Sequence, residues 1–236
     1  MDYMNKQGSK VSRFFEWVFS LVMVNLFTIT LSLFVITIIP ALTAATSTID
    51  GMRYNGPGKV IKTYFLNFKT YMERAFLVGI VVEIMLAICA FSMYFYKTRM
   101  PATNWISQAG FYAMGVVLLL ILFLSLHLPL IIANFPKLRY FDTFRLAIFI
   151  SFRYILSTLI LLVVLIIMVV GFIGFPIWVF FGVSLPLLMG IKLTESTYFY
   201  LKKIDIVAIM DRTHRIAEGE EDDDEDNPRN WANWWI

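Results

Sequence analysis

Long runs of apolar residues alternate with short polar segments along this chain. Runs at 15–39, 75–96, 106–133 and 154–193 carry few charged residues, and the segments between them hold several each. A helix needs about 20 apolar residues to cross the hydrocarbon core of a bilayer. The first three runs therefore each predict one transmembrane helix.

The fourth run is too long for one span. As a single helix, residues 154–193 would measure about 60 Å, twice the thickness of the hydrocarbon core. The glycines and the proline between Gly171 and Pro176 favour a turn there. This turn divides the run into spans at 154–172 and 174–193. We therefore predict an all-α integral membrane protein with five transmembrane helices.

Two further segments, 59–74 and 135–153, alternate basic and apolar residues at helical spacing. Such a pattern predicts amphipathic helices. They are expected to lie in the headgroup region on the cytoplasmic side, although the segment 59–74 fits docking against the protein's own bundle equally well.

Between the first apolar run and the segment 59–74, small and hydroxyl-bearing residues follow one another. They are interpreted as a conformational hinge or as close helix packing, and include Pro40, Thr43, Ala44 and Ala45.

The composition supports a membrane protein and argues against several other classes. The chain is 59% hydrophobic and 16% charged, whereas ordinary soluble domains have about 25% charged residues. The single cysteine, Cys89, excludes an intramolecular disulfide and a cysteine zinc cluster. No Walker A, His-Glu-x-x-His or Gly-x-Ser-x-Gly motif occurs. We therefore expect no enzymatic activity, no cofactor, no metal site and no nucleic-acid partner.

The distribution of lysine and arginine predicts the orientation. Most of these residues lie after the first, third and fifth predicted spans, for example Arg53, Lys59, Lys137 and Lys202. The positive-inside rule places such segments in the cytoplasm. The protein is thus expected in a bacterial cell membrane, with its N-terminus outside and its C-terminus inside.

The expected membrane domain covers residues 1–203, and a cytoplasmic tail covers residues 204–236. Eight of the nine residues at 218–226 are acidic, and Trp231, Trp234 and Trp235 follow them. An acidic run of this kind is typical of a solvated tail. Docking of the three tryptophans to a partner protein is the alternative interpretation.

Polar residues inside the predicted spans are the candidate functional residues. Glu83 lies near mid-depth of the second span, where an unpaired carboxylate costs several kcal/mol. His127 of the third span lies at a similar depth, and Asn25, Thr28 and Ser184 of other spans fall in or near the same band. We expect an intramembrane polar cluster, which either locks helices together or binds a ligand or relays a proton.

Two stretches and one residue carry a family resemblance. Residues 35–45 read VITIIPALTAA, residues 64–69 read YFLNFK, and Asn25 lies in the span before them. Together they resemble the YesL-like family of small bacterial membrane proteins. Members of that family are often encoded beside carbohydrate-importing ABC systems. The resemblance implies a non-catalytic accessory or regulatory subunit that contacts the permease and ATPase subunits of such a transporter. The alternative is a stand-alone small transporter or channel that uses the polar cluster around Glu83.

Overall fold

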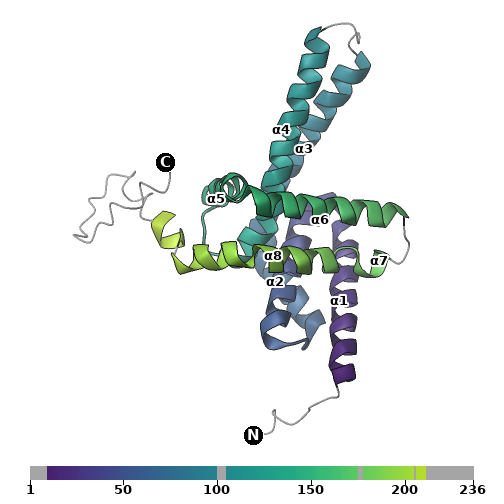
Figure 1. The fold of residues 1–236 in the computed structure, drawn as a ribbon, viewed down its shortest axis with the longest axis vertical. Helices are drawn as coiled ribbons and strands as arrows, with labels where there is room; N and C mark the ends of the chain where they lie inside the picture. The colour runs from purple at the N-terminus through teal and green to yellow at the C-terminus, as the bar shows by residue number, and fades with distance from the viewer. Residues whose placement is uncertain (1–9, 100–104, 175–177, 205, 211–236) are drawn as a thin grey trace, which may run out of the picture. The chain divides into compact units, whose positions relative to one another are not determined.

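The computed structural model describes residues 10–99, 105–174, 178–204 and 206–210. These residues form helices and no strand, which confirms the predicted all-α class (Figure 1). The chain divides into two compact units, residues 1–199 and 200–236. The helical elements are, in chain order, α1 (Lys10–Ser32), the short 3-10 helix η1 (Val35–Thr37), α2 (Ile38–Asn55), α3 (Val60–Arg99), α4 (Trp105–Asn134), α5 (Tyr140–Arg153), α6 (Ile155–Gly174), α7 (Trp178–Phe181) and α8 (Ser184–Lys203).

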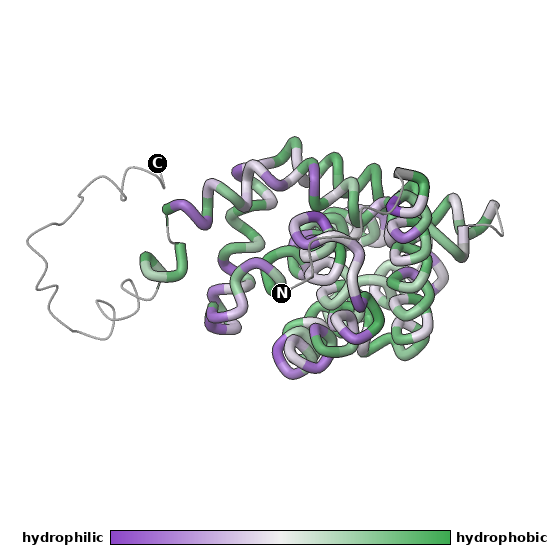
Figure 2. The backbone as a smooth tube through the Cα atoms, turned by 90° about the horizontal axis from the view of Figure 1, so that it is seen from below, coloured by the Kyte–Doolittle hydropathy of each residue, from purple (hydrophilic) through white to green (hydrophobic). Residues whose placement is uncertain are grey.

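Five helical segments of the described chain are long and apolar enough to cross a membrane. They are Val11–Ser32, Val35–Asn55, Val60–Arg99, Trp105–Asn134 and Ile155–Gly174. Hydrophobic residues predominate along these helices (Figure 2). The chain is therefore an all-α, multi-pass membrane protein. The number of candidate spans matches the prediction, but the segment 35–55 takes the place of the predicted span 174–193.

The predicted first span, 15–39, differs from the helix that forms there. Helix α1 ends at Ser32, and α2 begins at Ile38, so that Pro40 lies in the first turn of α2. Proline fits the first turn of a helix because the backbone N–H that it lacks would have no intrahelical partner there. The predicted end of the first span at residue 39, directly before Pro40, is therefore wrong. Pro40 stands at the start of a second helix.

Helix α2 is a central packing element that contacts α1, α3 and α4. Its alanines have no exposed surface, and three of its threonines donate their hydroxyl hydrogens to backbone carbonyls of the same helix, one turn earlier. Small residues allow neighbouring helix backbones to approach closely. This burial supports the packing interpretation of the segment over the hinge; the completely buried residues are Ala41, Thr43, Ala44, Ala45 and Ile49.

The predicted amphipathic segment 59–74 and the predicted span 75–96 form one continuous helix, α3. No glycine or proline interrupts the chain between them. The first part docks against α2. The Tyr64 hydroxyl lies 3.4 Å from the carbonyl oxygen of Ala41, and the Asn67 side-chain amide donates to the Thr48 hydroxyl at 3.0 Å. These contacts favour docking over an independent interfacial helix.

Helices α6 and α8 lie side by side and cross the direction of α3 and α4 (Figure 1). The Leu161 side chain of α6 lies 2.9 Å from where a Cβ atom of Gly190 on α8 would be. The chain thus folds back between them, as predicted, but α8 begins at Ser184 and not at residue 174. Proline in its third position, Pro186, suits the first turn of a helix, and Gly182 lies two residues before that start.

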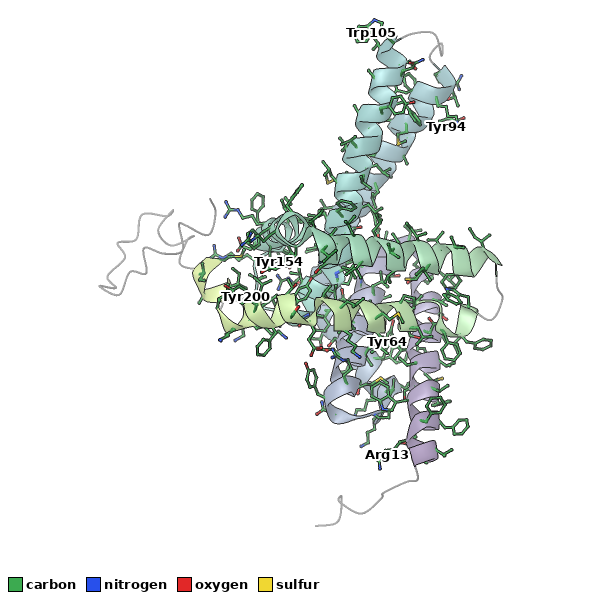
Figure 3. The ribbon with its side chains drawn as sticks, viewed as in Figure 1. Arg13, Tyr64, Tyr94, Trp105, Tyr154 and Tyr200 are labelled. Carbon is green, nitrogen blue, oxygen red and sulfur yellow. The ribbon has the colours of Figure 1, made fainter. Side chains whose placement is uncertain are left out.

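Helices α1, α2 and α3 alternate in direction. The turn between α1 and α2 spans only a few residues, and α2 packs against both neighbours. Arg13, near the start of α1, therefore lies at the same end as the connection between α2 and α3, which contains Lys59 (Figure 3). The sequence-based orientation placed these two groups on opposite sides of the membrane. The additional helix α2 brings them to the same end of the bundle.

Candidate functional site

His127 is the centre of a buried hydrogen-bonded group that joins three helices. It is fully buried on α4, and its Nδ1 atom lies 3.1 Å from the hydroxyl of Tyr198 on α8. Its Nε2 atom lies 3.0 Å from the hydroxyl of Thr158 on α6. The side chain thus cross-links α4, α6 and α8.

The hydrogen-bond pattern assigns the tautomer of this histidine. The Thr158 hydroxyl lies 3.1 Å from the carbonyl oxygen of Ser151, which can only accept. Since Thr158 donates its hydrogen there, it accepts from an N–H at Nε2 of His127. The unprotonated Nδ1 then accepts from the Tyr198 hydroxyl. Both ring nitrogens of the neutral imidazole are satisfied without any group from outside the chain.

Asn25 joins α1 to the start of α8. Its side-chain oxygen accepts hydrogen bonds from the backbone N–H groups of Val183, at 2.7 Å, and Ser184, at 3.1 Å. The first N–H groups of a helix have no partner within that helix. Asn25 therefore acts as a cap supplied by another helix. The predicted proximity of Asn25 and Ser184 is observed, and it runs through the backbone of Ser184. The Ser184 hydroxyl itself has no hydrogen-bond partner among the described residues.

Thr28 does not belong to the His127 group. Its hydroxyl donates to the carbonyl oxygen of Val24 in its own helix, at 2.7 Å. One turn earlier on α1, Asn25 points to α8, whereas Thr28 lies on the side of Tyr64 and α3. Its role is packing between α1 and α3.

Glu83 of α3 stands apart from the other polar side chains. Both of its carboxyl oxygens are buried, and neither has a hydrogen-bond partner within the described part of the chain. The ring nitrogens of His127 bond to Tyr198 and Thr158, so the predicted Glu83–His127 pair is not formed. The expected single polar cluster is therefore not formed. Its residues lie in three separate places: the His127 group, the cap formed by Asn25, and Glu83.

A charged contact between α2 and α8 was not anticipated from the sequence. The Arg53 guanidinium forms a salt bridge with the Glu195 carboxylate at 2.5 Å and a second one with Asp50 at 3.3 Å. Tyr54 donates a hydrogen bond to the other Glu195 oxygen at 3.1 Å. The hydrogen bond from Arg53 is the main reason that the pKa of Glu195 is lowered. In the sequence, Glu195 is the single acidic residue of the segment that forms α8. Its partner Arg53 lies more than a hundred residues earlier in the chain, so the sequence does not indicate the pair.

Arg74 of α3 donates hydrogen bonds to the connection between α4 and α5 and to the start of α5. Its guanidinium donates to the backbone carbonyls of Phe135 and Pro136 and, at 2.7 Å, to the Thr143 hydroxyl. In the sequence, Arg74 is one basic residue among several after the first predicted span. In the structure this side chain is a link between α3 and the start of α5.

Two expectations about sites concern other parts of the chain. Trp231, Trp234 and Trp235 lie outside the described residues, so the docking of the tail remains a prediction. Within the ranges that the structure describes, no three histidine, cysteine or acidic side chains gather in a group suited to a metal ion.

The fold and these internal links define a multi-pass α-helical membrane protein. Residues 21–93 match the family described as "Protein of unknown function, DUF624", to which YesL-like proteins belong. The matched region begins in α1, contains all of α2 and ends late in α3. It includes Asn25, the small residues of α2, Asn67 and Glu83. No curated protein and no solved structure matches the chain.

Proposed function

We propose that this protein is a non-catalytic accessory subunit that packs against a partner membrane protein and stabilises or regulates it. Following the resemblance to YesL-like proteins, the proposed partner is the permease of a carbohydrate-importing ABC transporter together with its ATPase. The protein itself would carry out no chemistry and would need no cofactor.

The observation that carries this proposal is the pairing of His127 and Asn25 with other helices of the same chain. A carrier needs polar groups that exchange partners with a solute or a proton. Here the His127 nitrogens and the Asn25 side-chain oxygen have partners on other helices of the same chain. Groups of this kind hold a bundle together, and a bundle linked in this way suits a protein whose task is to support another.

The outer surface of the α3–α4 hairpin also supports the proposal. The second half of α3 and the first half of α4 contact each other, but one side of each helix remains open. An exposed apolar surface on two helices is suited to lipid chains or to the helices of a partner. Its most exposed apolar residues include Ile84, Ile88, Phe91, Tyr112 and Val116.

One observation favours a second function, that of a small stand-alone carrier. Glu83 offers a carboxyl group that has no hydrogen-bond partner within the described residues. An intramembrane carboxyl group without a partner is a common element of proton and ion pathways. In this alternative, Glu83 binds the transported proton or cation directly.

Copurification combined with a flux assay distinguishes the two functions. We expect the tagged full-length chain to retain permease and ATPase subunits at about one copy each when it is purified from native membranes. A tagged multi-pass protein of unrelated function and equal abundance is the control. Liposomes that contain only this chain should show no solute or proton flux. Flux that is present in the natural chain and lost on Glu83→Gln, without capture of transporter subunits, would establish the carrier instead.

We further propose that the end of the bundle with Arg13 and the α2–α3 connection faces the cytoplasm, because both carry basic residues. In a Cys89→Ala background, Arg13→Cys and Gly58→Cys should react with a membrane-impermeant maleimide only after the cells are permeabilised. Thr98→Cys, near the far end of α3, should react in intact cells. Labelling of Arg13→Cys and Gly58→Cys from opposite sides would contradict the shared end.

A further inference from the structure

Helix α5 has one buried and one exposed face. Its buried side packs toward α4 and contains Asp142, Thr143, Leu146, Ala147, Ile150 and Ser151. The opposite side presents Phe141, Arg145, Ile148 and Phe152, which are all exposed. Their spacing of four, three and four residues places them in one line along the helix. This line is called the α5 stripe.

The α5 stripe is both aromatic and basic. Phe141 and Phe152 are 72% and 63% exposed, which is unusual for phenylalanine in contact with water. The Arg145 guanidinium lies 5.9 Å from the centre of the Phe141 ring, so the charge is held beside the aromatic group. Aromatic and basic side chains in such an alternation occur where a helix lies in the headgroup region of a bilayer.

The charge around the α5 stripe is positive. Exposed Lys137 and Arg153 lie on either side of Arg145 in the sequence. Between residues 135 and 155 the only acidic residue is Asp142, which is 2% exposed. In the part of the chain that the structure describes, no carboxylate lies within salt-bridge distance of Lys137, Arg145 or Arg153. Among the described residues these three cations therefore have no salt-bridge partner, and they can bind an anion from elsewhere.

We propose that the α5 stripe binds anionic phospholipid headgroups, with Arg145 and Arg153 contacting the phosphates and Phe141 and Phe152 inserted between the neighbouring lipids. Guanidinium groups donate pairs of hydrogen bonds that match phosphate oxygens. Phenylalanine side chains gain free energy when they leave water for the boundary of the acyl chains. An acidic protein surface would satisfy the arginines but would not explain exposed aromatic residues at both ends of the same line.

The test is a lipid titration of the full-length chain, purified in a neutral detergent, with native mass spectrometry of the bound lipid. The probes are phosphatidylglycerol and phosphatidylcholine with identical acyl chains. Arg145→Gln/Arg153→Gln is compared with Lys97→Gln/Arg99→Gln, which removes the same charge from exposed positions at the end of α3. Each basic residue near an anionic surface contributes about a factor of five to binding, so we expect the α5 variant to bind phosphatidylglycerol about 30-fold more weakly.

The natural chain and the Lys97/Arg99 variant should bind phosphatidylglycerol equally well, and all three proteins should bind phosphatidylcholine equally weakly. Arg145→Lys/Arg153→Lys should recover most of the preference, and Phe141→Ala/Phe152→Ala should weaken binding of both lipids. Equal losses in the two glutamine variants, or no preference of the natural chain for phosphatidylglycerol, would overturn the proposal. Competition by inorganic phosphate at the same phosphate concentration would show a simple anion site and would also overturn it.

Discussion

His127→Leu should lower the free energy of unfolding by about 2 kcal/mol. Leucine fills a similar volume but cannot accept a hydrogen bond from Tyr198, whose hydroxyl is then left buried without this partner. The Thr158 hydroxyl keeps its bond to the Ser151 carbonyl, so most of the loss arises at Tyr198. The measurement is the midpoint of unfolding in a detergent series or during heating, with helix content as the signal.

A double-mutant cycle isolates this contribution. Tyr198→Phe in the His127→Leu background should cost less than Tyr198→Phe alone, because the hydroxyl that it removes has already lost its acceptor. Tyr112→Phe is the control. Tyr112 lies on α4, the helix of His127, and its side chain is 71% exposed. Additive effects of the His127 and Tyr198 substitutions would show that the two side chains do not interact.

Gly79→Ala should destabilise the protein by about 1–3 kcal/mol. A Cβ atom at position 79 would lie 3.0 Å from the Cβ and 3.1 Å from the Cγ1 of Ile39, at the contact between α2 and α3. The nearest atom is attached directly to the backbone of α2, so a change of side-chain rotamer cannot move it away. The helices must separate, and both lose packing. Ile39→Ala in the Gly79→Ala background should therefore restore stability only in part, because alanine keeps the Cβ.

Gly51→Ala is the matched control for this prediction. Gly51 also lies within a helix, α2, and no atom lies within 4 Å of the position of an added Cβ. Alanine has a higher helix propensity than glycine by about 1 kcal/mol, so Gly51→Ala should be neutral or stabilising. Equal unfolding midpoints for the two variants would mean that α2 and α3 do not approach each other closely at Gly79.

Much of the helix content followed from local patterns. The apolar runs at 75–96, 106–133 and 154–172 lie within α3, α4 and α6, apart from Tyr154 at the start of the last. The end of α2 at Asn55 also has a local cause, since Gly56 directly after it has a positive φ of 78° that other residues rarely adopt. These features depend on neighbouring residues along the chain. Pro40 misled the prediction because a proline is equally compatible with the end of one helix and the first turn of the next.

The candidate site was predicted less well than the helices. Depth along a helix placed Glu83 near His127, but two residues at one depth meet only if they also face each other. The rotation of each helix about its axis is set by the packing of all its neighbours. This rotation directs His127 to Tyr198 and Thr158. In the same way, Asn25 was recognised as a polar group in a span, but its partners are backbone N–H groups, which carry no signal in the sequence.

The sequence by itself determined that this chain is a helical membrane protein, since both properties follow from the length and apolarity of contiguous segments. Only the tertiary structure decided that residues 38–55 form a buried central helix, that Arg53 bonds to Glu195, and that Glu83 has no hydrogen-bond partner among the described residues. Such contacts join residues far apart in the chain. Their free energies depend on which helix faces meet, and that is settled by the packing of the whole bundle.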